Sequence, residues 1–92
     1  MQQEFAEIIA LKALAWLVGN EELLPVFLGA TGADIDGLRA GAADPAILVS
    51  ILDFVTMDDA WVTQFCDAND LKKSQPLEAR QVFAGAQHVH WT

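Results

Sequence analysis

The sequence predicts an all-α fold, a compact orthogonal bundle of about five to six short helices. Segments of strong helix formers with apolar residues at helical spacing follow one another along the chain, and signals typical of helix ends separate them. No segment has the alternating pattern of a half-buried strand. A chain of 92 residues has room for one core, so we expect a single helical domain over residues 1–92.

Residues 3–18 predict the first helix, because they are rich in Ala, Leu, Glu and Lys and contain neither Gly nor Pro before Gly19. The polar side of this helix is narrow and its large apolar side chains face several directions. Such a helix is expected at the centre of the fold or in a dimer interface. Ala6, Ala10 and Ala13 cluster on one side, where they would let a neighbouring helix approach closely.

Asn20 is the expected N-cap of a second helix that runs to about Leu28. Pro25 lies one turn inside this helix, which predicts a kink or an irregular start. Residues 29–32 contain two glycines and a threonine and are expected to form the following loop.

Aspartates mark the next helix starts. Asp34 is expected to cap a short third helix over residues 35–40, which Gly41 ends. Asp44 followed by Pro predicts the start of a fourth helix over residues 45–56. That helix is the most amphipathic element, with Ile47, Leu48, Ile51, Leu52, Phe54 and Val55 on one side and Ser50, Asp53 and Thr56 on the other.

Asp58 is the expected cap of a fifth helix over residues 59–69, with Trp61, Val62, Phe65 and Cys66 on its apolar side. Gln75 and Pro76 open a sixth helix that is expected to end near Gly85. The remaining residues, 86–92, are expected to form an irregular C-terminal tail.

The two halves of the chain are similar in pattern, which is consistent with two pseudo-repeated three-helix units. A shift of 38 residues places Ile9 on Ile47, Leu14 on Leu52 and Phe27 on Phe65, and it also aligns Asn20 with Asp58. Two helical hairpins of similar length would align this way without a duplication, so both explanations stay open.

The net charge of −8 at pH 7 limits the classes of molecule that the chain is expected to bind. Residues 1–71 hold twelve of the thirteen acids and only two of the five bases, whereas the bases prevail in residues 72–92. An acidic body without a basic stripe repels phosphate and anionic lipid, so we expect no nucleic-acid or membrane partner. A domain this small leaves apolar surface uncovered, which favours a homodimer or another protein partner.

A soluble, cytoplasmic location is expected. Cys66 is the single cysteine, so no internal disulfide forms and nothing indicates an oxidising compartment. The N-terminal residues 1–4 are acidic where a secretory signal would be basic, and the apolar run 8–18 is too short to cross a bilayer.

No arrangement of reactive residues predicts catalysis. The only histidines, His88 and His90, lie near the C-terminus, and Cys66 lies on an apolar helix face where an unreactive packed thiol is expected. His88 and His90 alone are a poor metal site, because no third ligand lies nearby in sequence. We therefore expect no catalytic residue, no cofactor and no metal.

Five residues are candidates for an interaction site: Asp58, Asp59, Trp61, His90 and Trp91. Asp58 and Asp59 form the tightest carboxylate pair, although a helix cap and an acid in the first turn explain both. Trp91 is an aromatic side chain next to the end of the sequence, and we expect it to pack into a groove on this subunit or on a neighbour.

Three segments resemble a known family: Trp16–Ala33 (WLVGNEELLPVFLGATGA), Asp44–Asp67 (DPAILVSILDFVTMDDAWVTQFCD) and the ending His90–Thr92. The chain is similar, almost from end to end, to domain of unknown function 3572, small all-helical proteins of alphaproteobacteria. Met57–Trp61 and Phe65–Ala68 are the most specific stretches. The resemblance implies an all-helical cytoplasmic protein with no assigned activity and no catalytic residues.

The leading hypothesis is a non-enzymatic protein-interaction module, in the form of a dimer, that binds another protein through an apolar groove with an acidic rim. A small regulatory or structural subunit of a larger assembly belongs to the same class. The alternative is a small enzyme or ligand binder with a pocket near Trp61 that uses Asp58 and Asp59. Inward-facing carboxylates would favour the alternative, and carboxylates bonded to backbone amides would favour the module.

Overall fold

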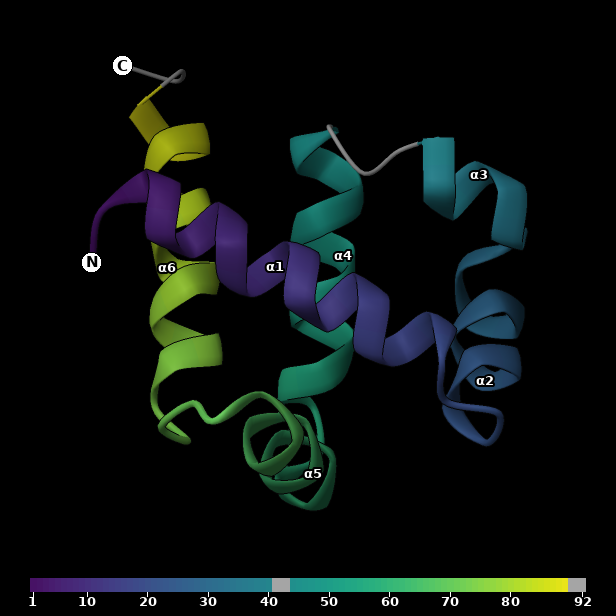
Figure 1. Ribbon diagram of the computed structural model, residues 1–92. Coiled ribbons are helices and arrows are strands. Elements are labelled where there is room, and N and C mark those ends of the chain that lie inside the picture. The colour runs from purple at the N-terminus through teal and green to yellow at the C-terminus, as the bar shows by residue number, and fades with distance from the viewer. Residues whose placement is uncertain (41–43, 90–92) are drawn as a thin grey trace.

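The computed structural model describes residues 1–40 and 44–89, and within them the chain folds into six helices with no strand (Figure 1). The helices are α1 (Gln3–Val18), α2 (Leu23–Thr31), α3 (Ile35–Ala40), α4 (Pro45–Thr56), α5 (Asp59–Asn69) and α6 (Gln75–Val89). The all-α bundle expected from the sequence is confirmed.

Short polar side chains stabilise the helix starts as predicted. Asp44 Oδ1 accepts a hydrogen bond from the Ala46 backbone N–H at 3.0 Å, and Asp58 Oδ1 accepts one from the Ala60 N–H at 2.8 Å. Asp34 Oδ1 accepts from the Gly37 N–H at 2.6 Å. A Cβ at Gly37 would lie 2.9 Å from that oxygen, so glycine makes room for the cap. These bonds satisfy backbone donors that have no partner inside the helix.

The second helix begins and ends later than the sequence indicates. Asn20 Oδ1 accepts from the backbone N–H groups of Glu22 and Leu23 at 3.1 and 3.0 Å, so it caps a turn that precedes α2. Pro25 lies within the first turn of α2, where a missing N–H costs little. The expected loop start at Gly29 is wrong, because α2 continues until Gly32, which has a left-handed φ of 74°.

The last helix also differs from the prediction. α6 continues through Gly85 to Val89, so the expected irregular tail is wrong for residues 86–89. A glycine inside a helix costs only about 1 kcal/mol relative to alanine, and no proline follows it to enforce a stop. The end of the third helix expected at Gly41, like residues 90–92 of the tail, lies outside the described residues.

The helices pack around α1, which crosses α4 and α6 (Figure 1). Ala6, Ala10 and Ala13 of α1 are completely buried. Their small side chains permit the close helix contact that the sequence predicts. α4 in turn packs against α5 and α6, and α2 leaves the end of α1 after a bend of 109°.

Apolar side chains from all six helices form one core. The buried set is Ala6, Ile9, Ala10, Ala13, Leu14, Leu17, Leu23, Phe27, Leu38, Leu48, Ile51, Leu52, Phe54, Val55, Phe65, Cys66, Ala79 and Phe83. The predicted apolar side of α4 is confirmed, since five of its six members are in this set and Ile47 packs against it.

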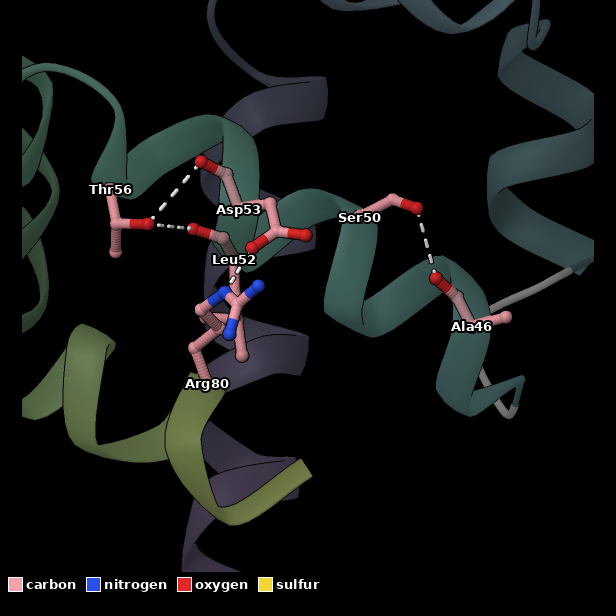
Figure 2. A network of polar contacts seen from close by, with 6 residues as sticks. All are labelled: Ala46, Ser50, Leu52, Asp53, Thr56 and Arg80. Carbon is pink, nitrogen blue, oxygen red and sulfur yellow. Dashed lines mark hydrogen bonds and ion pairs between the residues drawn. The ribbon is translucent and has the colours of Figure 1, made fainter. Parts of the chain in front are cut away.

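The polar side of α4 faces outward and connects this helix to α6 (Figure 2). Ser50 and Thr56 donate their hydroxyls to carbonyl oxygens of the preceding turn, those of Ala46 and Leu52. Asp53 accepts a charged hydrogen bond from Nε of Arg80 on α6. Because both charged side chains are partly exposed, this pair contributes little to stability.

The three-helix repeat that the sequence leaves open is matched in the order of the helices and not in their packing. α1 and α4 correspond in order, as do α2 and α5. The third helices are not equivalent: α6 packs along both α1 and α4, whereas α3 is a six-residue helix with one buried side chain, Leu38.

Within the described part of the chain, no single helix is long and apolar enough to cross a membrane. α1 and α2 pass that test only when they are taken together, and the bend of 109° separates them.

Candidate functional site

The two carboxylates at the start of α5 have different surroundings. Asp58 is bonded to the backbone N–H of Ala60, so its carboxylate is used to cap the helix. Asp59 lies in the first turn of α5, where the positive end of the helix dipole favours its charge, and its side chain is exposed. The structure therefore separates the pair: one carboxylate is structural, and the other is free to contact solvent or a ligand.

Trp61 is part of an aromatic cluster that joins three helices. Its ring stacks on Phe54 of α4 with a centroid distance of 4.7 Å and an interplanar angle of 23°. Phe54 meets the edge of Phe27 from α2 at 5.2 Å and 79°. Such geometries suit the charge distribution of aromatic rings, so half-buried Trp61 stabilises the contact between α4 and α5.

A pocket of about 350 Å³ lies where α4, α5 and the start of α6 meet. Its lining residues are Thr56, Asp59, Val62, Thr63, Lys73 and Leu77. Asp58 and Trp61, which the alternative hypothesis placed at a pocket with Asp59, do not line this one: Asp58 bonds its own helix and Trp61 packs on Phe54. Of the three candidates that the structure describes, Asp59 lines the pocket.

Sequence reasoning missed Lys73 and Thr63 as members of this pocket. Thr63 follows Asp59 by one helical turn, so the spacing alone could have placed the two side chains on one side of α5. Lys73 precedes α6 and reaches the pocket only through the fold. Together with Asp59 it gives the pocket one anionic and one cationic group.

A second, wider hollow of about 600 Å³ lies at the C-terminal end of α1. Its lining residues are Ala15, Trp16, Gly19, Asn20, Glu21 and Glu22. The Trp16 ring is half-buried and packs against Phe65 at a centroid distance of 5.7 Å. The lining of this hollow combines apolar atoms with two acidic side chains, Glu21 and Glu22.

Large apolar side chains are also exposed along the outer side of α1 and just before it. We call Met1, Phe5, Ile8 and Leu11 the α1 stripe, and their exposed fractions lie between 41% and 48%. Glu4 and Lys12, both exposed, lie among these side chains, one on each side of Ile8. At 100° per residue these side chains fall within one sector of α1 and its N-terminal extension, opposite the buried alanines. Ala15 continues the same sector into the hollow at Trp16.

Cys66 has the environment of a structural thiol. Its Sγ donates to the Lys72 carbonyl oxygen at 3.4 Å, and the residue is buried. Burial raises the pKa of the Cys66 thiol above its ordinary value of 9.0, the charge of Asp67 raises it further, and Lys73 partly opposes the shift. A thiol with a raised pKa is a weak nucleophile at neutral pH.

Among residues whose positions the structure describes, no group of three or more His, Cys, Asp or Glu side chains is arranged to hold a metal ion. The remaining candidates, His90 and Trp91, lie outside those residues. Their expected contacts stay predictions.

Comparison with known proteins agrees with the resemblance noted in the sequence. Residues 3–86 match the family model described as "Protein of unknown function (DUF3572)". No curated protein and no solved structure matched the chain significantly. The description of the family assigns no function, as the resemblance implied.

Proposed function

The chain belongs to the DUF3572 family, and we propose that it acts as a non-enzymatic protein-interaction module in the cytoplasm. The observation that carries this proposal is the α1 stripe. Four large apolar side chains are exposed together along the central helix of the bundle and its N-terminal extension. Single exposed apolar residues are ordinary on protein surfaces, whereas several large ones gathered on one helix face are typical of a protein contact.

The position of the stripe supports a docking role. Helix α1 is apolar on nearly every side, and its inner side is already filled by α4 and α6. A helix with this composition is stable when both sides are covered. The stripe continues through Ala15 into the hollow at Trp16, whose rim carries Glu21 and Glu22. An amphipathic helix that lays its apolar side on α1 and has a base near its end would complement this surface.

The state of the reactive groups supports a role without catalysis. The Asp58 carboxylate is bonded to a backbone amide, and the Cys66 thiol is buried with a raised pKa. Both groups have structural roles that leave them poorly suited to act as a base or a nucleophile at neutral pH.

The test is affinity capture from the native cell with the tagged chain and two matched variants. Ile8→Glu places a charge in the α1 stripe, and Val26→Glu places the same charge on α2, outside the stripe, where the valine is 51% exposed. We expect the wild type and Val26→Glu to retain the same protein, and Ile8→Glu to lose it while keeping its helical circular dichroism. Capture that is unaffected by Ile8→Glu would contradict this proposal.

A second candidate function is a ligand binder that uses the pocket of Asp59 and Lys73. One carboxylate and one ammonium on the wall of a pocket of about 350 Å³ would suit a small molecule that carries both charges. A screen of zwitterionic metabolites by thermal shift tests it. A hit supports this function only if both Asp59→Asn and Lys73→Met abolish the shift.

A further inference from the structure

We propose that the α1 stripe is covered by the α1 stripe of a second copy of this chain, with the two α1 helices antiparallel and Ile8 on the two-fold axis. This inference rests on the proposed interaction function and names its partner. It concerns the stripe, Met1, Phe5, Ile8 and Leu11, together with the exposed charged residues Glu4 and Lys12 that lie on the same side of α1.

The stripe is self-complementary about Ile8. Phe5 and Leu11 stand three positions before and after Ile8, and Glu4 and Lys12 stand four positions before and after it. In an antiparallel pair centred on Ile8, Phe5 of each copy lies level with Leu11 of the other. A two-fold contact of this kind closes with two copies, because the same patch serves both partners.

The charges of Glu4 and Lys12 select the antiparallel orientation. Centring on Ile8 brings Glu4 of each copy level with Lys12 of the other, so opposite charges approach at both ends of the contact. A parallel pair would place Lys12 beside Lys12 and Glu4 beside Glu4. Lys12 is the only base of α1, in a chain with a net charge of −8, so its position in the stripe is specific.

The extent of the surface predicts a weak dimer. Sixteen residues that rise about 1.5 Å each make α1 about 24 Å long. One helix face of this length is at the small end of specific interfaces, which bury roughly 1,200 Å² or more in total. We therefore expect a dimer that dissociates at micromolar concentration and not a permanent one.

The experiment is sedimentation of the full chain between about 1 μM and 1 mM, a range that brackets a micromolar Kd. The wild type and Val26→Glu should dimerise alike, and Ile8→Glu should remain monomeric. Glu4→Lys and Lys12→Glu should each weaken the dimer about tenfold, because each creates two repulsive pairs, and the double reversal should restore it. These charged positions are exposed, so the variants keep the fold.

Cross-linking tests the register. Ile8→Cys, with the buried Cys66 retained, should form a disulfide-linked dimer under mild oxidation, whereas Val26→Cys should not. A monomer at every concentration overturns this inference, and so does a dimer that is insensitive to Ile8→Glu or that depends instead on residues 90–92. If the chain is monomeric while Ile8→Glu still abolishes capture of a different protein, the result supports the proposed interaction function and contradicts the antiparallel dimer.

Discussion

The stacking of Trp61 on Phe54 assigns a structural role to Trp61, a candidate interaction residue. A double-mutant cycle tests this contact directly. The perturbations are Phe54→Leu, Trp61→Leu and the two together. Leucine keeps most of the apolar volume at position 54, so the main loss is the aromatic geometry. Phe54 is 7% exposed and contacts two rings, those of Trp61 and Phe27.

The magnitude follows from those two contacts. An aromatic pair contributes about 0.5–1.5 kcal/mol beyond the area that it buries. Phe54→Leu removes two pairs and should lower the free energy of unfolding by about 2 kcal/mol. In a domain of this size that change lowers Tm by roughly 8–16 °C. The coupling between positions 54 and 61 alone should be about 1 kcal/mol.

Urea unfolding followed by far-ultraviolet circular dichroism measures all four free energies of the cycle. Trp16→Leu combined with Phe54→Leu is the control, because Trp16 packs on Phe65 and the two changes should add within about 0.5 kcal/mol. A coupling below about 0.3 kcal/mol, together with no cost for Trp61→Leu, would refute the stacking. Trp61 would then be available to a partner.

Three further predictions follow from the caps, the thiol and the C-terminus. Asp44→Ala and Asp58→Ala should each lower the free energy of unfolding in urea by about 1 kcal/mol, whereas Asp67→Ala should change it by less than about 0.5 kcal/mol. Equal changes for all three variants would contradict the capping role of Asp44 and Asp58. Burial raises the pKa of the Cys66 thiol, so the native protein should react slowly with thiol reagents. Because the Cys66 thiol ionises at a lower pH in the unfolded chain than in the folded protein, the free energy of unfolding should fall as pH rises above 9.0. Cys66→Ala should remove this contribution to the pH dependence. Deleting the last three residues, which include Trp91, should lower Tm by several degrees; an unchanged Tm and oligomeric state would assign Trp91 to an outside partner.

The helix starts could be predicted from the sequence because the interactions that make them are local. Asp44 and Asp58 bond N–H groups two residues further along, so residue type and spacing are sufficient to identify the caps. The bounds 3–18 and 45–56 were predicted for the same reason. Local signals failed where two residues competed for one role. Gly29 and Gly32 both permit a helix end. In the folded chain Gly32 adopts the left-handed conformation and ends the helix, and residue type alone does not distinguish the two glycines.

The candidate site was predictable only in part. The sequence identified Asp58, Asp59 and Trp61 as neighbours at the start of one helix, and it indicated that Cys66 is buried. It assigned Asp58 to the cap and Asp59 to the first turn, but it could not show that Asp59 lines a pocket, because that pocket depends on what tertiary packing places opposite α5. Lys73 is distant in sequence and enters the same pocket through tertiary packing.

The sequence by itself determined that α1 is apolar on nearly all sides, since that property depends only on residue type and helical period. It also marked one side as suited to a close neighbour, but tertiary structure decided which helices cover that side and which apolar side chains of α1 stay exposed. α4 and α6 pack where Ala6, Ala10 and Ala13 allow close approach, and the larger Phe5 and Ile8 remain outside. The physical reason is that burial requires two surfaces in contact. The side chains of one helix determine how closely a neighbour can approach, but the neighbours present in the fold determine which apolar surface stays exposed to water.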